Sequence, residues 1–211
     1  MKIYRLLLLI SFISVFHYTK SQTQITQDFP VSVTDAIPKD YAILSYTYGN
    51  LNRDTLKDLI IVLRCTRNEE TSGTISIMAR PLMVFIGQND HTFKLVKRCD
   101  FAVVPMGYGI EYQRVVVKNG FFSIELRSGY EWWNTRVITF KFNQGQNDWF
   151  LFKDGGERFN CYRAQIERRR DLTVKDFGVI SLEKYKWYEF NIEKYDPSTI
   201  QPIAGFNDYQ R

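Results

Sequence analysis

The sequence predicts an all-β protein, in which antiparallel sheets form two four-stranded groups packed as a sandwich-like domain. From Asp40 onward, short apolar runs alternate with turn residues, and no stretch of about 11 residues shows a convincing helical period. In "RVITFKF", residues 136–142, polar and apolar side chains alternate, which is typical of a strand with one wet and one buried face. A closed propeller needs about four or more blades of about 40 to 45 residues each, whereas the strands predicted here form two groups within residues 40–195.

The first 21 residues have the pattern of a secretory signal peptide. A short basic start is followed by an apolar run at 6–16 and by small residues at the −3 and −1 positions of a cut before Gln22. The run is shorter than the roughly 20 apolar residues that span a bilayer. We therefore expect a secreted or periplasmic protein with no membrane span after cleavage of residues 1–21. The alternative is an N-terminal helix buried in the fold.

The charge of the chain depends strongly on this leader. The whole sequence has 28 basic and 23 acidic residues, a net charge of +5. Without the basic residues of the leader, 25 basic and 23 acidic residues remain. This near balance gives no reason to expect a nucleic-acid partner.

The chain has three cysteines, Cys65, Cys99 and Cys161, and none of them has CxxC spacing. An odd number in an exported chain allows one disulfide and one free thiol, or three buried thiols. Cys65 and Cys99 both end predicted strands and could meet. Bridging them would require Cα atoms within about 7 Å.

The first group of strands is preceded by residues 22–39, which we expect to form an irregular arm. Four strands are predicted at 41–48, 59–65, 80–87 and 92–98. The second strand, "LIIVLRC", is continuously apolar, which indicates that it is covered on both faces.

The second group contains the strongest hairpin signal of the chain. Asn119 and Gly120 both tolerate the positive φ angles that a type I′ turn requires. Strands are predicted at 113–118, 121–127, 136–142 and 149–153, followed by a break at "DGG", residues 154–156. A short helical turn is expected within 171–176. The β domain is predicted to extend over 40–195, with a C-terminal tail at 196–211.

The loop between the first two strands carries the pattern of a cation site. Side-chain oxygens occur at Asn50, Asn52, Asp54 and Asp58, and Leu56 offers a backbone carbonyl. These are relative positions 1, 3, 5, 9 and 7, and alternate side chains of a tightly curled loop converge on one point. Oxygen ligands of this kind suit Ca²⁺, which takes six to eight of them. The alternative is a hairpin loop that is closed by Asx turns without an ion.

This loop resembles the calcium loop of FG-GAP and VCBS-type repeats, "D-x-N-x-D-G-x-x-D", over residues 41–65. Asn52, Asp54 and Asp58 match the family pattern, while Asn50 replaces an Asp and Thr55 replaces a Gly. The resemblance implies a structural Ca²⁺ between two strands, in a degenerate site. The rest of the chain resembles exported proteins of Bacteroidetes-type bacteria, through stretches such as "VKNGFFSIE" and "KDFGVISLEKY". That resemblance implies no particular activity.

An aromatic cluster next to glycine-containing turns is the second candidate site. Its members are Tyr108, Tyr112, Tyr130, Trp132 and Trp133. Tyrosine and tryptophan combine an apolar face with a polar group, so the cluster could form a platform for a sugar or a peptide. Alternatively, one tryptophan covers the core while its neighbour packs at a sheet edge.

Signals of catalysis are weak. His91 is the only histidine outside the leader and lies in the predicted turn "QNDHT", which argues against a Ser-His-Asp centre and excludes a histidine-rich zinc site. A carboxylate pair stays open, with possible members at Asp40, Glu111, Glu125 and Glu131.

The sequence therefore favours a secreted, non-enzymatic binding or interaction module with a protein or glycan partner at the cell envelope. One alternative is a cell-envelope hydrolase that uses a carboxylate pair. Another is an accessory protein that binds a second protein through its aromatic edge.

Overall fold

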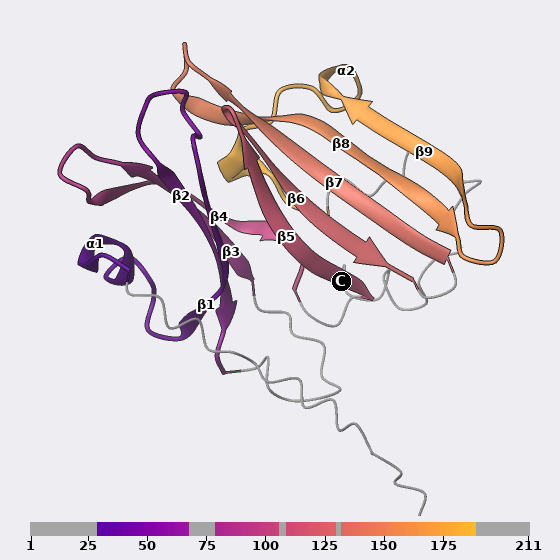
Figure 1. Cartoon of the computed structure of the whole chain (residues 1–211), viewed down its shortest axis with the longest axis horizontal. Helices are drawn as coiled ribbons and strands as arrows, with labels where there is room; N and C mark the ends of the chain where they lie inside the picture. The colour runs from indigo at the N-terminus through magenta and orange to yellow at the C-terminus, as the bar shows by residue number, and fades with distance from the viewer. Residues whose placement is uncertain (1–28, 68–78, 106–108, 130–131, 189–211) are drawn as a thin grey trace, which may run out of the picture.

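The computed structural model describes residues 29–67, 79–105, 109–129 and 132–188. The predicted leader and the C-terminal tail lie outside these residues. The described chain forms two antiparallel sheets whose strands follow one another in sequence order (Figure 1). The first sheet contains β1 (Tyr41–Gly49), β2 (Asp58–Cys65), β3 (Arg80–Gly87) and β4 (Phe93–Val103). The second contains β5 (Ile110–Lys118), β6 (Phe121–Ser128), β7 (Trp132–Asn143), β8 (Asp148–Asn160) and β9 (Gln165–Thr173).

The all-β prediction is confirmed, with one difference in strand number. The second group has five strands, and its strands run in a clearly different direction from those of the first group (Figure 1). Asn119 and Gly120 have φ angles of 47° and 78°, as the predicted type I′ turn between β5 and β6 requires. Within the described residues, no helix has the length and hydrophobicity needed to cross a membrane.

The predicted break at residues 154–156 is wrong, because β8 continues through both glycines. Gly155 pairs with Val137 on one side and Asp171 on the other. A Cβ atom on Gly156 would lie 2.1 Å from the carbonyl oxygen of Thr135, so this glycine allows close approach of the neighbouring strand. The two glycines are therefore sheet residues, and the strand predicted at 149–153 extends to Asn160.

The main hydrophobic core lies between the two sheets. It contains buried residues of both sheets and of the segment that follows β9: Ile60, Val62, Leu82, Val84, Cys99, Phe122, Ile124, Ile138, Phe140, Trp149, Leu182, Tyr185 and Trp187. The final segment includes helix α2 (Val174–Phe177) and the 3-10 helix η1 (Leu182–Lys184). It bonds to both sheets, since the N–H of Leu151 donates to the Ile180 carbonyl at 2.8 Å and that of Trp187 to the Phe101 carbonyl at 2.9 Å.

A second apolar cluster covers the opposite face of the four-stranded sheet. Val33 of helix α1 (Val31–Thr34) is fully buried against Leu59, Ile61 and Phe85. The predicted burial of β2 on both faces is confirmed. The N-terminal arm is less irregular than expected, because its residues 29–39 include a helix that packs on the sheet. Residues 22–28 lie outside the described part.

A disulfide between Cys65 and Cys99 does not form, and both residues are buried free thiols. Val62 and Cys99 both belong to the core between the sheets. Cys65 follows Val62 by three positions in β2, so strand alternation places it toward the opposite face. The Cys99 thiol instead donates to the carbonyl of Tyr185 at 3.3 Å, and burial raises its pKa to about 11. Cys161 is exposed, which differs from the alternative of three buried thiols.

A buried ion pair joins β7 to β8. The Nε and Nη2 atoms of Arg136 donate to the two carboxylate oxygens of Asp154 at 2.9 and 2.5 Å. The same guanidinium donates to the carbonyl of Trp187 at 3.1 Å and to the hydroxyl of Tyr185 at 3.2 Å. The Asp154 side chain is fully buried, so this network fixes the final segment against the five-stranded sheet.

Replacing Asp154 by Asn should lower the free energy of unfolding by about 3–5 kcal/mol, because it leaves the Arg136 charge buried without its counter-ion. Urea denaturation followed by tryptophan fluorescence measures the change. The control is Arg169→Gln, which breaks the more exposed Arg169–Glu157 pair and should cost less than about 1 kcal/mol. Equal losses in the two variants would contradict the central role of the buried pair.

Candidate functional site

The predicted metal loop is anchored at its end by Asp58. This side chain is fully buried, and its two carboxylate oxygens accept hydrogen bonds from the backbone N–H of Leu51 at 2.6 Å and of Gly87 at 3.0 Å. Burial raises the pKa of Asp58, while the two N–H donors oppose that shift. Asp58 therefore connects the loop to the end of β3.

The other predicted ligands close the loop through Asx-type hydrogen bonds. The side-chain oxygen of Asn50 accepts from the N–H of Arg53 at 2.6 Å, and that of Asn52 accepts from the N–H of Asp54 at 3.0 Å. One Asp54 oxygen accepts from the N–H of Leu56 at 2.7 Å. The Asn50 amide also donates to the carbonyl of Asp54. Each of the four polar side chains thus has a hydrogen-bond partner inside the loop or at its base.

The loop brings the predicted ligand residues together, but its shape is explained by these bonds. Among the described residues, no group of three or more His, Cys, Asp or Glu side chains could hold a metal ion. The positive φ angle of the loop is at Arg53, with a value of 67°, whereas the family pattern places its glycine at the position of Thr55. The geometry adds no support for Ca²⁺, and calcium binding at Asn50, Asn52, Asp54, Leu56 and Asp58 stays a prediction.

The described aromatic residues of the second candidate site, Tyr112, Trp132 and Trp133, do not share one surface. Tyr108 and Tyr130 lie outside the described residues. The Tyr112 hydroxyl and the Ser45 hydroxyl are 2.5 Å apart, and burial raises the pKa of Tyr112 to about 12. Because Ser45 is in β1 and Tyr112 is in β5, this contact links the two sheets. Tyr112 therefore contributes to the packing of one sheet on the other.

Trp132 and Trp133 point to opposite faces of β7, as alternation along a strand requires. The ring of Trp133 lies under the guanidinium of Arg127 at 3.8 Å and beside Phe159, with ring centroids 6.1 Å apart. Trp132 contacts Arg158 instead, at 4.5 Å. Only Trp133 lines the hollow on the outer face of the five-stranded sheet.

This hollow, which we call the sheet groove, has a volume of about 760 Å³. Trp133 lies toward one end of it, and Gly155 and Gly156 contribute to its floor. A hollow of this size is within the range of sites for small molecules and short oligomers. The polar residues around the groove come from all five strands of the sheet: Gln113, Arg114, Glu125, Arg127, Thr135, Thr139, Lys153, Glu157, Arg169 and Asp171.

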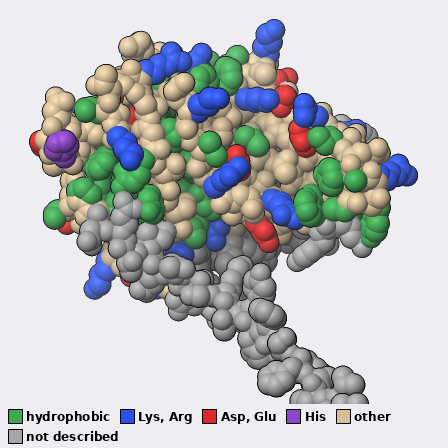
Figure 2. All heavy atoms as spheres, in the orientation of Figure 1, with side chains coloured by type: hydrophobic (Ala, Val, Ile, Leu, Met, Phe, Trp, Pro, Cys, Tyr) green, Lys and Arg blue, Asp and Glu red, His purple; other side chains and the backbone are tan. Residues whose placement is uncertain are grey.

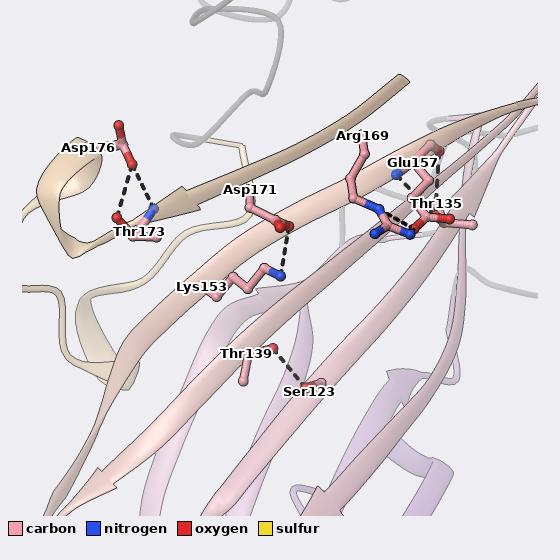
Figure 3. Close-up of polar contacts among 9 residues, drawn as sticks. All are labelled: Ser123, Thr135, Thr139, Lys153, Glu157, Arg169, Asp171, Thr173 and Asp176. Atoms are coloured by element: carbon pink, nitrogen blue, oxygen red, sulfur yellow. Dashed lines mark hydrogen bonds and ion pairs between the residues drawn. The ribbon is translucent and has the colours of Figure 1, made fainter. Parts of the chain in front are cut away.

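Paired charges line the groove on both sides. Arg114 pairs with Glu125 at 2.7 Å, Lys153 with Asp171 at 2.8 Å, and the Nε atom of Arg169 with Glu157 at 2.7 Å. Ser123 and Thr139 share a hydrogen bond of 2.9 Å between the two sides (Figure 3). In Figure 2, basic and acidic side chains lie beside one another over the area of β5 to β9. The groove is therefore polar, and its charged side chains are largely held in ion pairs.

A second hollow of about 620 Å³ continues the groove toward the turns. The two hollows share Lys153 and Asp171. Here the ammonium group of Lys141 lies 5.4 Å from the ring of Phe152 and 5.6 Å from that of Phe121. The two hollows together thus have a cation close to an aromatic ring near each end.

Sequence reasoning predicted part of this surface. The alternation in "RVITFKF" correctly assigned Val137, Thr139 and Lys141 to the wet face. Lys153 lies in the strand predicted at 149–153, but the break predicted at 154–156 excluded the two glycines of the groove. Asp171 was expected in a short helical turn, whereas it lies in β9.

The carboxylates proposed for hydrolysis that the structure describes do not form an isolated pair. Asp40 pairs with Arg67, and Glu125 pairs with Arg114. Glu111 is exposed and accepts a weak hydrogen bond of 3.4 Å from Gln113. Glu131 lies outside the described residues.

Comparison of the chain with protein-family models, with curated proteins and with solved structures found no match. The resemblance of residues 41–65 to FG-GAP repeats therefore rests on the loop residues alone.

Replacing Asp58 by Asn should lower the free energy of unfolding by about 1–3 kcal/mol, measured in chelator, because one of the two buried N–H groups loses its acceptor. Asp54→Asn is the matched control in the same loop. Its hydrogen bonds are exposed to water, so its loss should stay below about 1 kcal/mol. A larger loss for Asp54→Asn would show that Asp58 is not the anchor.

Calcium binding predicts that millimolar Ca²⁺ raises the melting temperature and that chelator reverses the change, since a ligand that binds only the folded state stabilises it. The increase should disappear in Asp54→Asn, which removes a carboxylate ligand without disturbing the buried anchor. Differential scanning calorimetry measures both. An unchanged midpoint at millimolar Ca²⁺ would contradict the site.

Proposed function

We propose that the protein is a non-enzymatic binding module that acts outside the cytoplasm and takes up an extended oligosaccharide in the sheet groove. The observation that carries the proposal is the long polar hollow on the outer face of the five-stranded sheet, with Trp133 near one end. The opposite, four-stranded sheet has its outer face covered by α1 and its neighbouring residues. The pattern of residues 1–21 supports export.

Oligosaccharide is the ligand class that suits the chemistry of the groove. A sugar hydroxyl both donates and accepts hydrogen bonds, so it can bind a guanidinium or ammonium N–H and a carboxylate oxygen that lie side by side. Three such pairs, Arg114–Glu125, Lys153–Asp171 and Arg169–Glu157, are present. In each pair, the two side chains hold each other in position, which reduces the side-chain entropy lost when a ligand binds.

A peptide fits this surface less well. Sheets usually recognise an extended peptide by adding it as a strand at an edge, where backbone N–H and C=O groups are available. The groove lies on the face of the sheet, where side chains of β5 to β9 are the binding groups.

The paired carboxylates also favour binding over hydrolysis. In glycoside hydrolysis a pair of carboxyl groups flanks the scissile bond, one as the acid and the other as the base or nucleophile. Glu125, Glu157 and Asp171 are instead each engaged in an ion pair with a cation of the same surface.

Replacing Trp133 by Ala should weaken oligosaccharide binding about tenfold or more, because the aromatic face at the end of the groove is lost. The purified protein is first screened on an array of oligosaccharides, and the affinity for the strongest binder is then measured by isothermal titration calorimetry.

Trp132→Ala is the matched control, since this neighbour points away from the groove. Its affinity should stay within about twofold of the unmodified protein, and melting curves show whether either variant has lost its fold. No binding on the array, or equal loss in the two variants, would contradict the proposed function.

A further inference from the structure

The charges of the groove indicate which oligosaccharides it takes. We propose that the ligand is an acidic oligosaccharide, whose anionic groups contact Arg127 at one end of the groove and Lys141 at the other. This inference rests on the proposed function and specifies its ligand class.

The carboxylates around the groove are already engaged. Glu125, Glu157 and Asp171 each form an ion pair with a cation of the same surface. These three pairs cancel in charge. They offer hydrogen bonds to a ligand but no net attraction for an ion.

Arg127 and Lys141 differ from the other cations of this surface. Arg127 lies over the ring of Trp133, and Lys141 lies near the rings of Phe121 and Phe152. Among the residues that the structure describes, neither has a carboxylate at ion-pair distance. Glu111 lies opposite Arg127 in the pairing of β5 with β6, but the two side chains form no ion pair. Within the described part of the chain, Arg127 and Lys141 are therefore the cations of this surface that no ion pair engages.

Both cations point to the same side of the sheet. β6 and β7 pair without a register shift, with Arg127 opposite Thr135 and Phe121 opposite Lys141. In this register, the alternation of side chains along each strand places Arg127, Thr135 and Lys141 on the same, outer face of the sheet. Thr135 and Lys141 are six positions apart in β7, which corresponds to about 20 Å at about 3.4 Å per residue. A ligand that contacts both cations must therefore be extended over several sugar units.

The aromatic neighbours prepare both cations for an anionic group. Stacking on Trp133 occupies one face of the Arg127 guanidinium and leaves its N–H edges for a planar carboxylate or a sulfate. Phe152 is 47% exposed, so the face of a sugar could cover its ring while an acidic substituent contacts Lys141. Between these ends, the hydroxyls of Ser123 and Thr139 and the ion pairs match the neutral hydroxyls of a sugar chain.

The test compares hexasaccharides of uronic acid with the same hexasaccharides after methyl esterification, which removes the charge and keeps the backbone. Sulfated hexasaccharides are a second acidic probe. Calorimetry on the full-length protein should show tighter binding of an acidic probe than of the neutral one, with an affinity that falls as salt increases.

The variants Arg127→Gln and Lys141→Gln should each weaken acidic binding about fivefold, and together about 25-fold because the two positions are far apart. They should leave the weaker binding of the neutral hexasaccharide within about twofold. The control is Lys94→Gln, which removes the same charge from an exposed position in β4 of the other sheet and should leave both affinities unchanged.

Three results would overturn the inference. Equal affinity for neutral and acidic hexasaccharides, lost in Trp133→Ala, would keep the groove as a sugar site and reject its charge preference. Tighter binding of hexaglutamate than of any acidic hexasaccharide would reject the sugar class. Absence of binding to every oligosaccharide would reject the proposed function together with the inference.

Discussion

The buried contact between Arg136 and Asp154 is the interaction on which the rest of the molecule depends. Two charges removed from water are stable only when their hydrogen bonds are satisfied, and here a bidentate pair, a hydroxyl and a carbonyl meet that condition. Tyr185 and Trp187 belong to the segment that fills the space between the sheets. Burial raises the pKa of Tyr185 well above its ordinary value, so this hydroxyl stays neutral beside the ion pair. The network therefore joins sheet, core and final segment in one unit.

The same pair determines which residues face the groove. Arg136 and Asp154 point inward, so their strand neighbours Thr135, Val137 and Gly155 must point outward. A register slip of one residue would expose the charged pair to the groove and bury the polar residues of the outer face. The cost of leaving either charge unpaired makes such a slip unfavourable. The outer face of the five-stranded sheet thus has its orientation set by an interaction in the core beneath it.

The predicted metal loop and the groove are different kinds of site. The loop directs the oxygens of its polar side chains to backbone N–H groups, and it packs on the β5–β6 turn, where the Gly120 N–H donates to the Asn50 carbonyl at 2.9 Å. Its evident role is to join the two sheets at one end, with or without an ion. The groove instead presents polar side chains, several of them in ion pairs, to solvent.

The sequence by itself determined the local features of this protein. Turn residues such as Asn119 and Gly120 specify backbone conformation, and alternation assigns faces within a strand, because both effects act between near neighbours. The continuous apolar run of β2 likewise predicted that this strand is buried on both faces. Tertiary structure decided what depends on pairing between distant strands. Pairing with its neighbours continues β8 through its glycines, and the sheet places Cys65 apart from Cys99. Arg136 pairs with Asp154, and residues of five strands line one groove. These outcomes depend on register and sheet packing, which no short stretch of sequence encodes.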